Sequence, residues 1–418
     1  MIAYSVERAR VLFAEGRFSA ALAVFGTNLP EDPKLALLCA ESLGEVGRHD
    51  EALSIIASVG ATYSADVAIT ATVQRVSGTI VLDRGDRTAG EERLKTAVAL
   101  AEACGNPAEG ARAALRLFTH VHSSSGRSRS WELLDLLKRL VLRGNQVPLL
   151  ADLHSRVGQA EAQSGNLNAA QRHLTRASEL LAENPHHGVI ARTRLALSST
   201  LALQCRNDLA MQHAKEALKS AEEAGSVALA RLCRANAAQL QYRTASFASA
   251  IQNARELLSN DALSSTLRLA VLETFVAALL ESGGNLEDAP EVQEFLDTLD
   301  GEQDPSWVAV EAVPTQARAL LRLGMVDEAI AALQQGRVRS RARGHSDNDC
   351  RLALIEAEVA ALRGQSTRAQ ELSGQALDVA GPSPSAEILG LFERVRGLIA
   401  AICGARRSAR VHLGNSER

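Results

Sequence analysis

Residues 317–333, ARALLRLGMVDEAIAAL, decide the fold. Ahead of Gly324, Ala317 and Leu320 are spaced so that they share one face of a helix, and Ala329 begins a second apolar face after it. A glycine between two such faces allows a sharp reversal, because it has no side chain to oppose a left-handed backbone. The stretch therefore predicts two helices joined by a tight turn.

The same turn recurs along the chain at intervals of about 40 residues. A turn residue, usually glycine, is followed five positions later by a small residue, usually alanine. The pairs are Gly16 and Ala21, Gly47 and Ala52, Gly85 and Gly90, Gly165 and Ala170, Cys205 and Ala210, Ala245 and Ala250, Gly284 and Ala289, Gly324 and Ala329, Gly364 and Ala369, and Gly404 and Ala409. Gly126 and Trp131 are the one exception. This register predicts tandem helix–turn–helix repeats.

A second column of small residues lies seven positions before each turn residue. Its members are Ala9, Ala40, Gly78, Thr119, Gly158, Ser198, Ala238, Ala277, Ala317, Ala357 and Gly397. Small side chains on both helices of a pair let the two backbones approach closely. A single pair cannot bury its own apolar face, so the pairs are expected to stack.

Glycines also mark the expected ends of the second helices, where a left-handed cap would form. They are Gly105, Gly144, Gly225, Gly301, Gly344 and Gly381. Prolines also lie at expected helix ends, at Pro107 and Pro382 beside two of these glycines and at Pro185 after Asn184, and a proline there prevents the helix from continuing. Each unit is expected to be a short first helix, a tight turn and a longer second helix.

These residues resemble the tetratricopeptide repeat (TPR) family. Ala21, Phe25 and Pro33 reproduce the second-helix signature of that family at its spacing. The early tryptophan of the family is missing, Trp131 interrupts the small column, and the period is nearer 40 than 34 residues. Longer units of this kind are similar to those of bacterial signalling proteins and transcription regulators. HEAT and armadillo arrays share the period, but they do not require the glycine-to-alanine turn.

The resemblance implies an all-α fold, a right-handed α-α superhelical solenoid of about eleven repeats that spans residues 1–418 as a single domain. The last repeat is expected to be incomplete, because few residues follow Gly404. It is either a short cap or part of a longer chain. The implied function is a non-catalytic scaffold for protein–protein interaction, which binds a partner peptide or helix on its concave surface. The alternative is the sensor or regulatory arm of a larger bacterial signal-transduction protein or transcription regulator.

The composition excludes several other classes. Aromatic residues make up only 3% of the 418 residues, and the net charge is −4 with a pI of about 6.2, which argues against binding to nucleic acid or anionic membrane. Apolar runs are interrupted by charges, so no membrane span is expected, and the charged N-terminus does not resemble a signal peptide. The scattered cysteines suggest buried thiols in a reducing compartment, and we expect a cytoplasmic protein.

No motif points to catalysis or to a cofactor. Phosphate-binding loops, dinucleotide-binding glycine motifs, zinc-protease motifs and nucleophile elbows are absent from the sequence. His120 and His122 lie two apart on an expected helix and cannot grip one metal ion together, and His186 and His187 are expected in a loop beside Pro185. The sequence therefore predicts no enzyme, no metal site and no cofactor.

The charge pattern supplies one candidate contact surface. Glu291, Glu294 and Asp297 belong to a long stretch without lysine or arginine, and four arginines follow in the next unit, Arg337, Arg339, Arg341 and Arg343. The simpler interpretation is a set of solvated charges, with arginines favoured near a helix C-terminus. The alternative is a bipolar patch that docks a charged partner or a second copy of the chain.

Two further segments bear on binding. The Ser-rich residues 122–130 replace the usual turn of the fourth unit and are expected to form a lengthened turn, a modification site or a contact loop. TPR arrays that bind acidic tails carry a clamp of Lys, Asn and Arg along their first helices. The corresponding positions here are expected to be mostly Leu, Ala, Ser, Gln and Thr, which favours a helix or an extended peptide as the ligand.

Overall fold

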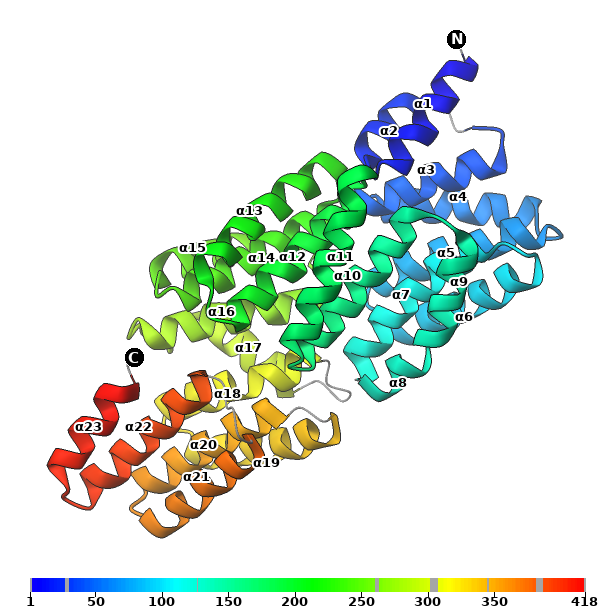
Figure 1. The fold of residues 1–418 in the computed structure, drawn as a ribbon. Coiled ribbons are helices and arrows are strands. Elements are labelled where there is room, and N and C mark those ends of the chain that lie inside the picture. Colours follow the sequence, from blue (N-terminus) through cyan, green and yellow to red (C-terminus); the bar gives the residue numbers. More distant parts are fainter. Residues whose placement is uncertain are drawn as a thin grey trace. The chain divides into compact units, whose positions relative to one another are not determined.

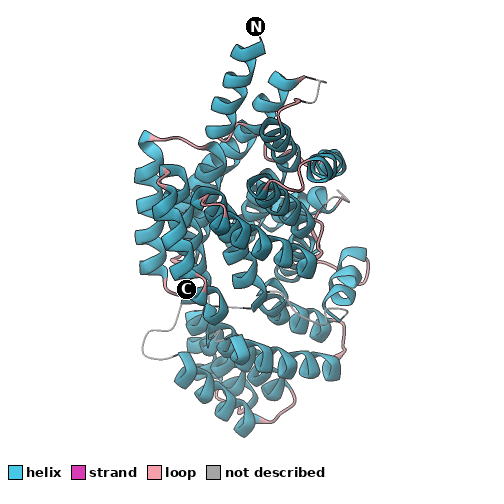
Figure 2. Ribbon diagram, turned by 90° about the vertical axis from the view of Figure 1, so that its right-hand side faces the viewer, coloured by secondary structure: helices cyan, strands magenta, loops and turns pink. Residues whose placement is uncertain are grey.

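The structure is a computed structural model, and it describes residues 2–26, 30–125, 127–259, 263–300, 307–343, 346–380 and 386–416. These residues form 23 helices and no strand (Figures 1 and 2). None of the described helices combines the length and the apolar character that a membrane span needs. The predicted all-α class of helical repeats is confirmed.

The helices form eleven pairs, as the turn register predicts. The first helices are α1 (Ile2–Ala14), α3 (Pro33–Glu45), α5 (Val67–Asp83), α7 (Pro107–Ser125), α10 (Val147–Gln163), α12 (His187–Leu203), α14 (Val227–Arg243), α16 (Ser265–Glu281), α18 (Trp307–Arg322), α20 (Ser346–Leu362) and α22 (Ala386–Ile402). The second helices are α2 (Phe18–Phe25), α4 (His49–Thr62), α6 (Arg87–Ala103), α8 (Arg127–Glu132) with α9 (Leu134–Gly144), α11 (Leu167–Glu183), α13 (Asn207–Ala224), α15 (Phe247–Leu258), α17 (Pro290–Asp300), α19 (Val326–Arg343), α21 (Ser366–Ala380) and α23 (Arg406–Ser416). The expectation of a short first and a long second helix is wrong, because the first helix is as long as the second or longer in most pairs.

The turns adopt the predicted left-handed backbone. The turn glycines at 16, 47, 85, 165, 324, 364 and 404 all have positive φ, and so do the two non-glycine turn residues, Cys205 at 59° and Ala245 at 57°. In the turn at Gly324, the amides of Gly324 and Met325 donate to the carbonyls of Leu321 and Leu320, which closes the end of α18.

Three turn or cap predictions need correction or fall outside the described residues. In the eighth pair the left-handed residue is Gly283 instead of Gly284, and a loop runs from there to Ala289, so α17 starts late. The left-handed cap of α9 is Asn145, one residue after the predicted Gly144. The predicted turn at Gly126 and the predicted caps at positions 301, 344 and 381 lie outside the described residues.

The two columns of small residues are the points where the helices of a pair meet. Alanines of both columns are almost completely buried, among them Ala9, Ala21, Ala317 and Ala329. At Gly158 on α10, an added Cβ would lie 3.2 Å from the carbonyl oxygen of Ala170 on α11 and 2.7 Å from a Leu174 carbon. The pair therefore packs so closely at this point that even the Cβ of an alanine would force Leu174 to shift.

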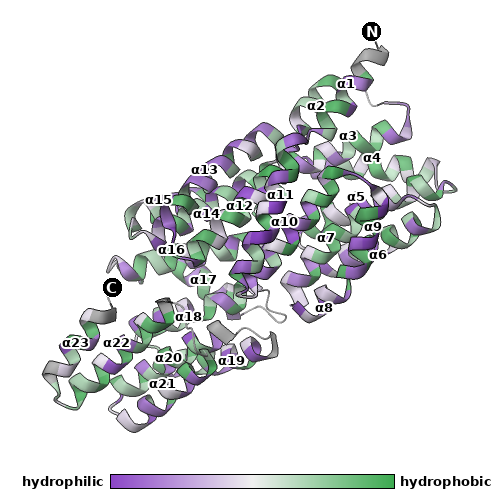
Figure 3. Cartoon of the chain, in the orientation of Figure 1, coloured by the Kyte–Doolittle hydropathy of each residue, from purple (hydrophilic) through white to green (hydrophobic). Residues whose placement is uncertain are grey.

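The chain divides into two compact units, residues 1–267 and residues 268–418. In the N-terminal unit, separate hydrophobic clusters form within successive repeats, for example around Leu37 and Ile56 and around Phe118 and Leu137. In the C-terminal unit, Ala353 and Leu372 belong to such a cluster. Hydrophobic and hydrophilic residues are interspersed along the helices of both units (Figure 3). The prediction that the eleven repeats form a single domain stays a prediction.

Two local expectations are wrong. The Ser-rich residues 122–130 are mainly helical, because α7 continues to Ser125 and α8 begins at Arg127. His122 is buried there, and its Nδ1 lies 3.0 Å from the Ser130 hydroxyl. Of the six cysteines, all of them free thiols, only three are buried, and Cys104, Cys205 and Cys403 are exposed, because they lie at or beside turns.

Candidate functional site

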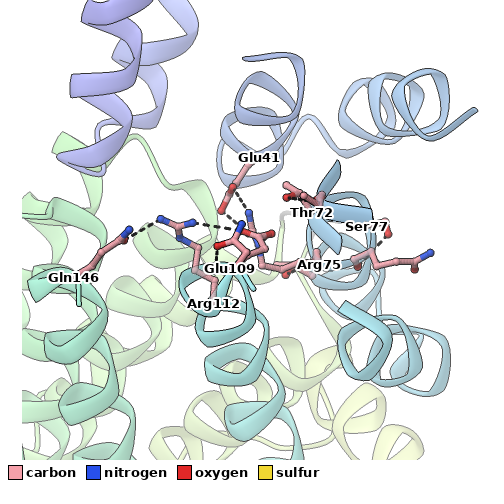
Figure 4. Close-up of polar contacts among 11 residues, drawn as sticks. Glu41, Thr72, Arg75, Ser77, Glu109, Arg112 and Gln146 are labelled. Carbon is pink, nitrogen blue, oxygen red and sulfur yellow. Dashed lines mark hydrogen bonds and ion pairs between the residues drawn. The ribbon is translucent and has the colours of Figure 1, made fainter. Parts of the chain in front are cut away.

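Charged side chains form a ladder across successive first helices of the N-terminal unit (Figure 4). Arg75 on α5 donates from both terminal nitrogens to Glu41 on α3, at 2.7 Å each, and from Nε to Glu109 on α7 at 2.6 Å. Glu41, Arg75 and Glu109 follow one another at intervals of 34 residues, and they come from the first helices of three consecutive units. The side chains of Arg75 and Glu109 are only 7% and 4% exposed.

Arg112 extends this ladder to the next repeat. It donates to Glu109 at 3.3 Å and to the side chain of Gln146, the residue that precedes α10, at 3.2 Å. Its side chain is 37% exposed, whereas Arg75 is enclosed. Arg112 is therefore a member of the ladder that a ligand can reach. We call Glu41, Arg75, Glu109, Arg112 and Gln146 the ion ladder.

A second group, the Asp152 cluster, consists of Asp152, Arg156 and Arg192. The Asp152 carboxylate accepts from Nε of Arg156 on α10 at 3.0 Å and from Nε of Arg192 on α12 at 3.1 Å. Although burial opposes ionisation of Asp152, the two arginines lower its pKa to about 2. Arg192 is 25% exposed. We refer to the surface formed by the ion ladder and the Asp152 cluster as the first-helix face.

The two groups are close enough to affect one another. Burial disfavours the Glu41 carboxylate, but Arg75 outweighs it, with Arg112 and His186 contributing, so the pKa of Glu41 is lowered. Burial lowers the pKa of His186 to about 4, and the positive charge of Arg192 adds to this effect. A titratable group whose pKa is strongly shifted, and which lies beside charged partners, is typical of functional sites.

The N-terminal unit also closes on itself. Residues 15–19 and 45–47 contact residues 186–188 and 225–227, and we call this contact the seam. Its partners are separated by up to 206 positions in the sequence. The chain thus winds through five repeats and meets its own beginning, which brings α12 and α14 close to α1, α2 and α3.

Hydrogen bonds across the seam are few and well defined. The His187 amide donates to the Glu15 carbonyl at 2.8 Å, and the Ser226 hydroxyl donates to the Glu45 carboxylate at 2.8 Å. Burial raises the pKa of Glu45, although Arg192 opposes this shift. Glu45 therefore belongs to the seam, and its pKa also depends on the charge of Arg192 in the Asp152 cluster.

The charge patch predicted from the sequence lies in the C-terminal unit, and several of its members bind neighbouring helices. Arg337 on α19 binds Asp349 at 3.1 Å and Glu356 at 2.7 Å, both on α20. Arg341 also binds Asp349, at 2.8 Å, although its side chain is 58% exposed. These arginines hold α19 against α20, in addition to any role at the surface.

The other patch residues have separate locations. On α17, Glu294 pairs with Arg268 of α16, and Asp297 accepts from the Gln293 amide at 2.8 Å. Glu291 lies in the first turn of the same helix. Arg339 lines a shallow surface depression with Gln335 and Val338. The side chain of Arg343 lies outside the described residues.

The first helices of the N-terminal unit carry charged residues that the sequence analysis did not single out. The signal was a charged residue within an apolar helix, as with Arg75 between Val73 and Val76. The glutamates that pair with Arg75 lie 34 residues before and after it, and this spacing differs from the register of the turns, so an alignment of the repeats does not place the three residues in one column. Similar pairs join first helices in the C-terminal unit, where Arg351 binds Glu311 at 3.2 Å.

Neither a protein-family model nor a curated protein sequence matches the chain. Solved structures are similar in fold. One is a Rap protein complexed with Competence and Sporulation Factor, with a TM-score of 0.61 and 12% identity over 83% of this chain and 97% of that one. Another is NprR in complex with its cognate peptide NprX, with a TM-score of 0.51 and 11% identity over 92% of this chain and 96% of that one. The fold is therefore that of a TPR-like helical-repeat protein.

Proposed function

We propose that this chain binds a peptide on the first-helix face of its N-terminal unit and acts as a regulatory scaffold. The charged side chains on successive first helices carry the proposal, because they include Arg112 and Arg192, which are partly exposed and can donate hydrogen bonds to an extended peptide. The two similar structures support it, since each was solved with a bound partner and one of these partners is a peptide.

The exposure pattern suggests which residues contact the ligand. Arg75 and Glu109 are enclosed and bound to partners within the ion ladder, so they shape the face. Arg112 and Arg192 are partly exposed, and the two terminal nitrogens of Arg192 are not used in binding Asp152, whose contact is to Nε. These two arginines are the expected donors to peptide carbonyls or carboxylates.

A library of synthetic pentapeptides with free termini, screened by fluorescence anisotropy, tests the proposal. Arg112→Ala is expected to weaken binding of a selected peptide at least tenfold. Arg139→Ala is the matched control, because Arg139 is 60% exposed on α9 and contacts Glu102, away from the first-helix face. Equal effects of both variants, or no binding peptide in the library, would contradict the proposal.

Further parts of this proposal derive from the sequence. We propose a non-catalytic cytoplasmic protein whose eleven repeats form one continuous solenoid of the long TPR type known from bacterial signalling proteins. The half-buried Arg339 and the exposed Arg341, with Glu291 and Asp297, remain a proposed docking patch for a charged protein. Charge reversal at Arg341 would test the patch, since it should weaken capture of such a partner without affecting the pentapeptide.

A further inference from the structure

The seam is a small contact between well-packed segments, and it consists of a few hydrogen bonds with the Phe18 and Val227 side chains beside them. Two hydrogen bonds of 2.8 Å cross it, together with a longer one of 3.5 Å from the Ser19 hydroxyl to the Gly225 carbonyl. The aromatic ring of Phe18 meets the His186 ring edge-on, with centroids 6.2 Å apart. Such contacts contribute much less than a shared hydrophobic core would.

The hydrophobic clusters on the two sides of the seam are separate. The cluster that contains Leu37 draws its residues from α2 to α5, and the cluster that contains Val189 draws its residues from α10 to α12. Parting the seam therefore leaves both clusters intact. Each repeat contacts mainly its neighbours, so a small rotation at each junction between α3 and α14 adds up to a large displacement at the seam.

We propose that the seam is a reversible gate, which opens to admit a peptide to the first-helix face and closes over the bound peptide. The inference rests on the proposed function as far as the peptide is concerned. Opening separates Glu15 from His187 and Glu45 from Ser226, while the helices on both sides keep their internal hydrogen bonds.

Glu45 links the gate to the first-helix face. Its carboxylate holds Ser226 across the seam and lies within electrostatic range of Glu41 and Arg192. A ligand group that binds Arg192 changes the field at Glu45 and thereby the strength of the seam. By linkage, the state of the seam changes the affinity for that ligand by the same factor.

An engineered disulfide across the seam tests the gate. A Cβ at position 47 would lie 3.9 Å from the Cβ of Val227, which is within the range of a disulfide. The left-handed backbone at Gly47 accepts a cysteine, since Cys205 occupies the same turn position with φ of 59°. The variant is Gly47→Cys with Val227→Cys, in a background where Cys104 and Cys403 are replaced by serine and Cys205 by glycine. Each single variant is a control, and peptide mapping verifies the pairing.

Hydrogen exchange of the segment around His187 gives the first measurement, which needs no ligand. Oxidation is expected to slow this exchange at least tenfold, with exchange in the middle of α10 unchanged, and Ser226→Ala is expected to accelerate it. Equal exchange in the oxidised and reduced proteins would show that the seam does not open, and would overturn the inference.

Peptide kinetics give the second measurement. With a pentapeptide selected from the library, the disulfide is expected to slow association and dissociation at least tenfold, and reduction is expected to restore both rates. Unchanged rates combined with slowed exchange would show that the seam opens but does not gate the face. A library without any binder would contradict the proposed function, and the exchange measurement would still decide whether the seam opens.

Discussion

Arg75 shows how a charge can be buried in a helical repeat. Burial disfavours its charged form, but Glu109 and Glu41 outweigh this and raise the pKa of the guanidinium. All three nitrogens of the planar group donate to carboxylates of the preceding and following repeats, and Arg75 thereby joins three units. Removing one partner of such a buried group costs more than replacing the whole group by apolar residues.

Arg75→Met is therefore expected to destabilise the N-terminal unit by about 3–5 kcal/mol, because Glu41 loses its hydrogen-bonded counter-ion and the buried Glu109 keeps only Arg112. Chemical denaturation measures the loss in the free energy of unfolding, and hydrogen exchange of α5 assigns it to the N-terminal unit. The triple variant with Glu41→Leu and Glu109→Leu should recover much of it. A single variant as stable as the parent would show that the ladder contributes no stability.

A close pair of histidines predicts how stability depends on pH. Nδ1 of His154 on α10 lies 2.9 Å from Nδ1 of His173 on α11, and burial lowers the pKa of both rings, with His173 adding to the effect on His154. Below a pH of about 6.5 the unfolded chain binds more protons than the folded chain, so the free energy of unfolding falls as the pH is lowered. Melting temperatures at pH 7.5 and 5.5 measure this.

The double variant His154→Gln with His173→Gln provides the comparison for that experiment. It should lose less stability between the two pH values than the parent does. His120, His186 and His213 have lowered pKa values as well and stay in both proteins, so only the difference reports on the pair. Identical pH profiles would exclude a contribution of the pair.

At the scale of single elements, the turns between paired helices are the most regular feature of the molecule. A left-handed residue ends the first helix in nearly every described pair, and glycine supplies it in most of them. Cys205 and Ala245 take the same conformation with a Cβ, which costs roughly 1–2 kcal/mol for each residue. Their turns are kept by the packing of the flanking helices.

Cys205→Gly is accordingly expected to stabilise the chain by about 1 kcal/mol. The thiol is exposed, so the substitution removes little packing. Thermal unfolding of the variant and the parent tests this. The opposite substitution, Gly165→Ala, is expected to destabilise the chain by a similar amount. No atom lies within 4 Å of an added Cβ there, so only the backbone conformation is affected. A loss of stability in the first variant would mean that the thiol packs.

The sequence predicted the elements well because their cause is local. Turn glycines and small residues such as Ala317 and Ala329 act within one pair of helices, so a single repeat displays the rule. The eighth pair escaped prediction because Gly283 and Gly284 are adjacent and either can take the left-handed position. The ion ladder around Arg75 and the seam at Ser226 were not predicted, because they depend on contacts between repeats, which no single repeat reveals.

At the scale of the whole molecule, the seam makes the N-terminal unit more than a linear stack. Gly225 illustrates how closely the two sides approach, since an added Cβ would lie 1.9 Å from the Ser19 hydroxyl oxygen. Gly225 also has a positive φ of 69°, so any substitution there has a backbone cost. A control variant is therefore needed that has the same backbone strain as a substitution at Gly225 but no collision with Ser19.

Gly225→Ala and Gly105→Ala form such a pair. Gly105 has a φ of 67°, and an added Cβ there meets no atom within 4 Å. Both variants should lose about 1 kcal/mol through backbone strain. Only Gly225→Ala should also accelerate hydrogen exchange around His187, because it forces the seam apart. Similar exchange in the two variants would mean that the contact at Ser19 adjusts without opening.

A chain that meets its own beginning also has a particular order of synthesis. The carbonyl of Glu15 leaves the ribosome 172 residues before its partner, the amide of His187. At about 5–20 residues per second, this is a delay of roughly 10–35 s. During that time the segment around Glu15 lacks its partner across the seam, so in the nascent protein this edge of α1 and α2 is open to chaperones and proteases.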